Sequence, residues 1–135
     1  MAERGWAIAV ATFYRDLADR LVEGAQRVFG EADVYEVPGA FELPIAARYC
    51  AEAGYEGVAC LGAVIRGETD HYDYVCSSAA SGILRVSLDT GVPCSFGVLT
   101  VENMDQALAR LGEKRHQGED AARAVVRMAE LKRSL

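Results

Sequence analysis

Several classes of protein need residues that this chain has in short supply. Its 135 residues include only two histidines and four cysteines, and no two cysteines form a CxxC pair. A zinc site built from these ligands is therefore disfavoured, and free buried thiols of a cytoplasmic protein are expected instead. With 14 basic against 20 acidic residues, the net charge of −6 also disfavours general binding to nucleic acid or anionic lipid.

Long apolar runs are missing as well. The apolar stretches have the length of strands, which predicts that the protein does not cross a membrane. The amino-terminal segment MAERGWAIAVATF carries Glu3 and Arg4 before a short apolar run, unlike a secretory signal. We therefore expect a cytoplasmic protein.

The rest of the composition is that of an ordinary folded protein. Hydrophobic residues make up 51% and charged residues 25%, with no low-complexity tract. A chain of this length buries roughly two-thirds of the surface that its unfolded form exposes. The sequence therefore predicts one domain over residues 1–135, with one core and no second domain.

Short apolar runs alternate with longer helical patterns along the chain. The periodicity predicts strands at 6–12, 33–37, 57–65 and 94–99, and helices at 16–29, 43–53, 70–88 and 118–132, with a further short helix ending near Leu111. The run GVACLGAVI at 57–65 is nearly all apolar, as in a central strand covered on both faces. This order predicts an α/β fold with a parallel sheet between layers of helices.

Ligands in such folds bind beyond the carboxyl ends of the strands. The four loops expected there hold nearly every unusual residue of the chain: Phe13-Tyr14-Arg15, Pro38 to Glu42, Arg66 to His71, and Thr100 to Asn103. They offer flat aromatic surface, a carboxylate, glycines that let a ligand approach the backbone, and one imidazole. The sequence thus places a candidate site at this edge of the sheet.

His71 is the candidate for proton transfer. It is predicted to lie in the first turn of its helix, where the macrodipole disfavours the imidazolium. A histidine held in this way can accept and return protons. The alternative is that His71 merely helps to cap the helix; its position at a strand's carboxyl end favours the functional role.

Other candidates also have two interpretations. Gly67 to Asp70 precedes a helix and can present N–H groups to a phosphate, but Thr69 or Asp70 can equally be an ordinary N-cap. Phe13 and Phe41 are either core residues or platforms that stack on a planar ligand. The cluster of Arg110, Lys114, Arg115 and His116 is either a solvated helix end or an anion site.

Three long motifs carry a resemblance to a known family. VPGAFELP (37–44), GAVIRGETDHYDYV (62–75) and FGVLTVENMDQALAR (96–110), in this order and spacing, resemble the lumazine synthases, the penultimate enzymes of riboflavin biosynthesis. The resemblance covers essentially the whole chain. It implies a flavodoxin-like three-layer α/β/α sandwich around a four-stranded parallel sheet. It also implies an enzyme that uses no metal or organic cofactor.

The same resemblance implies a reaction. Enzymes of this family condense 5-amino-6-(D-ribitylamino)uracil with 3,4-dihydroxy-2-butanone 4-phosphate, which gives 6,7-dimethyl-8-ribityllumazine, phosphate and water. The resemblance implies that Phe13 would stack on the pyrimidine and that Val64 and Ile65 would line the ring pocket. It also implies that Ala40, Phe41 and Glu42 would hold the ribityl chain.

The remaining implied roles concern the phosphate and the proton. Glu68 and Thr69 would help to seat the phosphate, and His71 would transfer protons. Phe96 and Arg110 would come from the adjacent subunit, with Arg110 pairing with the phosphate. The implied partners are thus small-molecule substrates and further copies of the chain. The copies would form a homopentamer, with a decamer and a 60-subunit shell as larger alternatives.

The chain departs from the family pattern at a few positions. Tyr14 stands where the family commonly has asparagine, and Gln117 and Asp120 stand where a lysine and a glutamate are frequent. Lys114, Arg115 or His116 are candidates to replace the lysine at the phosphate. A non-catalytic flavin or lumazine carrier on the same fold remains a rival, because its ring contacts would persist. A receiver module is disfavoured, because no acidic cluster follows the first strand.

Overall fold

The computed structural model describes residues 4–135, so Glu3 of the amino-terminal segment lies outside the described residues. Its centre is a parallel sheet with the strand order β2-β1-β3-β4. The strands are β1 (Trp6–Ala11), β2 (Ala32–Val37), β3 (Gly57–Ile65) and β4 (Cys94–Val101). The predicted α/β fold with a four-stranded parallel sheet is confirmed, and each strand boundary lies within two residues of its prediction.

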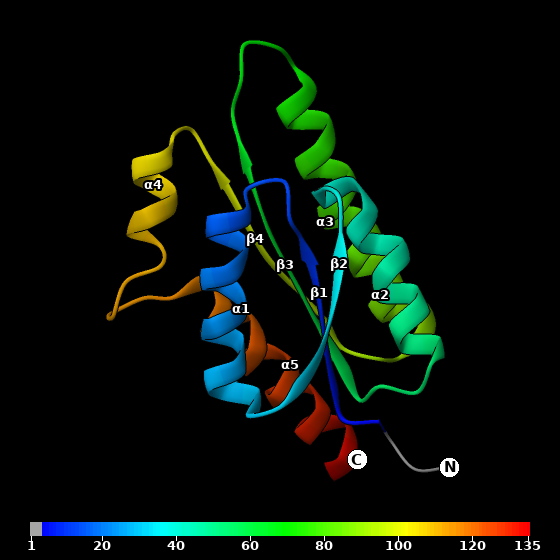
Figure 1. Cartoon of the computed structure of the whole chain (residues 1–135). Helices are drawn as coiled ribbons and strands as arrows, with labels where there is room; N and C mark the ends of the chain where they lie inside the picture. Colours follow the sequence, from blue (N-terminus) through cyan, green and yellow to red (C-terminus); the bar gives the residue numbers. More distant parts are fainter. Residues whose placement is uncertain (1–3) are drawn as a thin grey trace.

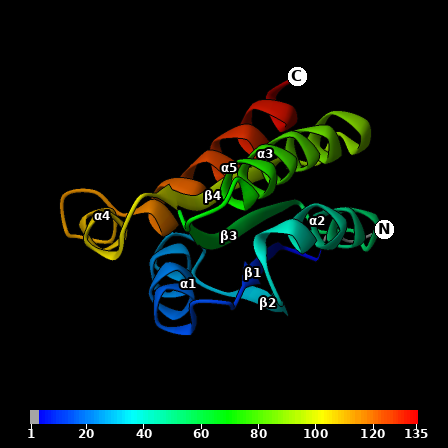
Figure 2. The same cartoon turned by 90° about the horizontal axis from the view of Figure 1, so that it is seen from above.

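Helices cover both faces of this sheet. One face carries α1 (Arg15–Phe29) and α5 (Gln117–Ser134), and the other carries α2 (Leu43–Glu52) and α3 (His71–Thr90) (Figure 1). The short helix α4 (Met104–Ala109) lies to one side of these layers (Figure 2). The arrangement matches a flavodoxin-like three-layer sandwich. The one helical segment that the sequence did not predict is a single 3₁₀ turn, η1 (Ala40–Glu42).

The burial of each strand follows its place in the sheet. Every residue from Gly57 to Ala63 in β3 is buried, as expected of a central strand. β2 is an edge strand and is largely exposed. The run CSFGVL at 94–99 was expected to be a buried strand; this was wrong for its first three residues, because β4 forms the other edge, where Cys94 and Ser95 are partly buried and Phe96 is exposed.

The two helices on the α1 face pack unusually closely. A Cβ added at Gly118 of α5 would lie 2.2 Å from the backbone oxygen of Leu21 in α1. No side chain fits at that distance, so the packing of α5 on α1 requires glycine at this position. Within residues 4–135, no helix is both long and apolar enough to cross a membrane.

Candidate active site

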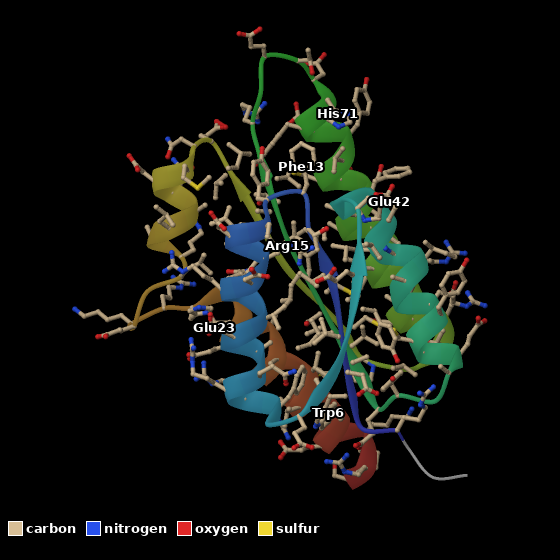
Figure 3. The ribbon with its side chains drawn as sticks, viewed as in Figure 1. Trp6, Phe13, Arg15, Glu23, Glu42 and His71 are labelled. Atoms are coloured by element: carbon tan, nitrogen blue, oxygen red, sulfur yellow. The ribbon has the colours of Figure 1, made fainter. Side chains whose placement is uncertain are left out.

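A cavity of about 580 Å³ opens where β1, β2 and β3 end. The strand order reverses between β1 and β3, which is where ligands bind in open α/β sheets. Figure 3 shows Phe13, Glu42 and His71 at this end of the sheet, with Trp6 at the opposite end. The predicted site residues that line the cavity are Phe13, Ala40, Phe41, Glu42, Val64, Ile65 and His71.

The two aromatic rings at the cavity are exposed. Phe13 is 76% and Phe41 is 62% exposed, so neither is a core residue of this chain, and both leave a ring surface free for a planar ligand. The ring of Tyr14 meets that of Phe13 edge to face, with 5.0 Å between the ring centroids. Tyr14 lines the cavity too and supports the orientation of the Phe13 ring.

The segment after β2 is held by its own hydrogen bonds. The Gly39 N–H donates to Glu42 Oε1 at 3.0 Å, and the Glu42 N–H donates to the Gly39 oxygen at 3.1 Å. These two bonds close the turn at η1 and leave Ala40 6% exposed beneath it. The Glu42 carboxylate is therefore held at the cavity wall by the backbone around it.

His71 is the first residue of α3 and so lies in the first turn of the helix, as predicted. The Thr69 hydroxyl accepts the His71 backbone N–H at 3.3 Å, whereas the Asp70 side chain makes no cap hydrogen bond. The backbone N–H of His71 is thus satisfied by Thr69, and the role of the His71 side chain stays a prediction. The exposed imidazole lies at the cavity.

Arg66 organises the loop between β3 and α3, a role that the sequence did not reveal. Its Nε donates to Glu102 at 2.6 Å and its Nη2 to Asp73 at 3.2 Å, while its guanidinium lies 4.2 Å from the Tyr72 ring centroid. The hydrogen bond to Glu102 is the main cause of the raised pKa of Arg66. The pairing with Glu102 joins two loops that are far apart in sequence, so no local pattern signals it.

Four predicted site residues lie outside the cavity of a single chain: Glu68, Thr69, Phe96 and Arg110. Glu68 and Thr69 are exposed on the loop before α3. Phe96 pairs with Cys60 near the start of β4, away from the strand's carboxyl end. Arg110 caps the end of α4, where its Nη1 donates to the Gln106 oxygen at 2.9 Å.

The structure also adds residues to the cavity wall. Tyr74 and Val75 of α3 line it, and Tyr74 is 72% exposed. Tyr74 follows His71 by three residues, so the two share a helix face. That spacing was the signal that sequence reasoning could have used.

The predicted basic cluster is divided by the fold. Lys114 and Arg115 are exposed beside Arg110, but His116 is only 6% exposed. Its Nδ1 accepts the backbone N–H of Gly118 at 3.1 Å and so caps α5. Burial, followed by the nearby Arg27, lowers the pKa of His116. The interpretation of His116 as part of a solvated helix end was therefore wrong.

All four cysteines are free, as predicted. Cys50 and Cys60 are buried, but Cys76 and Cys94 are only partly buried, so the expected burial holds for two of the four. Burial raises the pKa of the Cys94 thiol to about 11. Such a thiol carries little thiolate near neutral pH, which disfavours a nucleophilic role.

Comparison with known proteins covers nearly all of the residues that the structure describes. A sequence model of a family described as 6,7-dimethyl-8-ribityllumazine synthase matches residues 4–133. The chain belongs to this family.

Relatives named for the same activity span bacteria and plants. A 6,7-dimethyl-8-ribityllumazine synthase of Salinibacter ruber is 46% identical over 135 residues, which cover 93% of this chain and 86% of the relative. That of Deinococcus radiodurans is 49% identical over 124 residues, covering 85% and 80%. The chloroplastic enzyme of Spinacia oleracea is 46% identical over 134 residues, covering 93% of this chain and 60% of the relative.

Proposed function

We propose that this chain is a transferase that condenses 5-amino-6-(D-ribitylamino)uracil with 3,4-dihydroxy-2-butanone 4-phosphate. The product is 6,7-dimethyl-8-ribityllumazine, in the penultimate step of riboflavin biosynthesis. The observation that carries the proposal is one cavity at the switch of the sheet, lined by Phe13, the Ala40–Glu42 turn and His71, in a chain of this family. Its action in the cytoplasm remains a prediction based on the free cysteines.

The cavity offers the groups that the ring and ribityl chain require. The exposed Phe13 ring stacks on the pyrimidine, and Val64 and Ile65 supply an apolar wall. The ribityl hydroxyls lie along the turn at 40–42, where the Glu42 carboxylate is already oriented. Stacking and hydrogen bonds together fix the plane and the direction of the first substrate.

The reaction needs proton transfers and a phosphate site. An amine attacks a ketone, water and phosphate depart, and a ring closes, and each step moves protons that His71 can accept and return. Glu68 and Thr69 on the preceding loop help to seat the phosphate. Holding both substrates together supplies much of the acceleration, because orientation alone contributes up to ~7–11 kcal/mol in favourable cases.

A complete site requires a second copy of the chain. Phe96 and Arg110 lie outside the cavity of their own chain, and both side chains are exposed. In a ring of subunits they reach the cavity of a neighbour, where Arg110 pairs with the substrate phosphate. The assembly that we propose is a homopentamer, with a decamer or a 60-subunit shell as its larger forms.

The test of the activity is direct. Purified protein is mixed with both substrates, and lumazine absorbance and phosphate release are followed together. We expect both signals above the uncatalysed background. Product formation no faster than the background, combined with tight flavin binding, would instead identify a non-catalytic carrier. Gln117, in the place of the frequent lysine, is the reason for this alternative. Light scattering of the same sample measures the assembly.

A second experiment tests whether the site lies between subunits. Phe13→Ala and Arg110→Ala chains are co-expressed with different tags, and the mixed oligomer is isolated. Random mixing leaves about a quarter of the interfaces with both native residues. We expect activity well above that of either variant alone; activity no higher than the mean of the two would contradict a shared site.

A further inference from the structure

His116 is the one buried polar or charged residue among residues 4–135. Its Nδ1 accepts the backbone N–H of Gly118 at 3.1 Å. A backbone amide can only donate, so Nδ1 carries no proton and the imidazole is neutral, with its hydrogen on Nε2. Protonation would place a second hydrogen between these two nitrogens and abolish the N-cap of α5.

The ring of His116 packs against the backbone of α1. A Cβ added at Gly24 of α1 would lie 2.4 Å from Nδ1 of His116, so the ring rests directly on the helix backbone. On the other side, Gly118 is in contact with the backbone of Leu21. Because the backbone of α1 blocks this side, an imidazolium that has lost its hydrogen bond must move away from α1.

His116 is joined to Arg110 through the loop between α4 and α5. The Gln117 N–H donates to the Arg110 oxygen at 2.9 Å, and Leu111 and His116 form an antiparallel bridge. The Gly112 N–H donates to the Arg115 oxygen at 3.0 Å. The loop is therefore a closed hairpin, and the residues at its base set the position of the Arg110 backbone.

Charged groups face His116 from every element packed against it. They are Arg20, Glu23 and Arg27 of α1, Glu113 of the loop, and Glu119 and Asp120 of α5. Burial and Arg27 favour the neutral ring, whereas Glu119 and Asp120 favour the charged one; burial has the largest effect. A cavity of about 580 Å³ bordered by His116 gives solvent protons a route to it.

We propose that His116 is a positioning residue: its neutral imidazole holds the 110–117 hairpin on α1 and so presents Arg110 to the phosphate of the substrate. Protonation of His116 releases the hairpin and weakens phosphate binding. The role of Arg110 rests on the proposed function. The cap and the hairpin do not, so they can be tested separately.

The sign of the pH effect follows from the lowered pKa of His116. As the pH falls below the ordinary histidine pKa of about 6.5, the unfolded chain takes up a proton that the folded residue resists. Stability contributed by His116 is therefore complete above this value. It declines as the pH falls toward the pKa of the folded state.

Two variants separate the cap from the titration. His116→Asn retains an oxygen acceptor for the cap but does not titrate, and His116→Ala removes the acceptor. KM for each substrate is measured from about pH 8 to about pH 5.5, since the second pKa of a phosphate also lies near 6. His116→Asn experiences the same titration of the substrate and thus isolates the contribution of His116.

For the native protein we expect KM for the phosphate substrate to rise with falling pH by roughly fivefold more than for His116→Asn. KM for the pyrimidine substrate should not show this difference. In His116→Ala, KM for the phosphate substrate should be raised at every pH. An identical pH dependence in the native protein and His116→Asn would overturn the positioning of Arg110.

Hydrogen exchange tests, without any turnover, whether protonation of His116 releases the 110–117 hairpin. Peptides spanning 110–120 should be protected at pH 8 and lose protection at low pH in the native protein, relative to His116→Asn at the same pH. Equal protection in both at every pH would overturn the protonation switch. If neither the native protein nor the variants make product, the proposed function fails, but hydrogen exchange still shows whether protonation of His116 breaks the cap of α5. If His116→Ala does not fold, the comparison of the native protein with His116→Asn is sufficient.

Discussion

The cavity at the carboxyl ends of the strands and the junction between α1 and α5 are built in opposite ways. At the cavity, aromatic side chains remain in water, and Phe13 is 76% exposed. At the junction, a methyl group would not fit at Gly118, which lies against the backbone of Leu21, or at Gly24, which lies against the buried ring of His116. One region leaves aromatic surface open for a ligand, and the other packs its helices so closely that two positions require glycine.

This difference has a thermodynamic basis. A binding surface must keep apolar area exposed until its ligand arrives, so it contributes little to the stability of the free protein. Close packing and a satisfied cap contribute stability and hold the neighbouring hairpin in one position. We therefore expect mutations in the two regions to separate cleanly: the junction should control stability, and the cavity should control turnover.

The largest expected effect is at the junction. Gly118→Ala places a methyl group against the backbone of Leu21 and should lower the free energy of unfolding by roughly 3 kcal/mol. Urea unfolding measures the change. Gly112→Ala is the matched control, since its new Cβ would meet only an ordinary contact at 3.9 Å. Equal destabilisation by both would mean that α5 does not pack tightly on α1.

His71→Ala tests the cavity. General acid–base catalysis is typically worth 10²–10⁴, so we expect kcat to fall roughly 100-fold without disappearing, because substrate orientation remains. The free energy of unfolding should change little, since the imidazole is exposed. Steady-state kinetics measures kcat, urea unfolding measures the free energy of unfolding, and light scattering shows whether the assembly is intact. Complete loss of activity with intact assembly would contradict this division of labour.

A smaller effect is expected at the stacking platform. Phe13→Ala should reduce kcat/KM about tenfold, which corresponds to roughly 1.4 kcal/mol of lost aromatic contact. Stability should stay within about 0.5 kcal/mol, because the ring is exposed in the free protein. Phe13→Tyr keeps the ring and serves as the control. A marked loss of stability in Phe13→Ala would instead assign the ring a core role.

The smallest effect concerns an ion pair at the junction. Hydrogen bonds from Arg27, and then from Arg123, hold the pKa of Glu119 below its usual value of 4.5. The carboxylate therefore stabilises the fold above that value, and the contribution is lost as the pH falls through the lower pKa of the folded state. Glu119→Gln should lower the urea midpoint slightly, and by more at pH 6 than at pH 3, whereas Glu113→Gln should change neither.

Sequence reasoning succeeded where the signal is local. The apolar run at 57–65 and the period of the helices predicted the element boundaries within two residues. The alternation of strands and helices also located the cavity, because it determines which loops share an edge of the sheet. Phe13 and His71 were identified on that basis, and both line the cavity.

It failed where one residue depends on another far along the chain. Arg66 pairs with Glu102, 36 positions away, and neither neighbourhood signals the other. His116 stands in a polar stretch, GEKRHQ, and was expected to be solvated. It is buried because Gly24, in α1, has no side chain, and the imidazole of His116 occupies the space that a Cβ at Gly24 would need.

The sequence by itself determined the elements, their order and the edge of the sheet at which the candidate site lies, because hydrophobic period and connection rules act over short distances. Only the tertiary structure decided that the second histidine, His116, is buried against α1 rather than solvated. It also revealed the pairing of Arg66 with Glu102, which joins two loops at the edge of the sheet. The burial and contacts of a side chain depend on how segments far apart in the sequence pack against one another, and a local sequence pattern does not encode that packing.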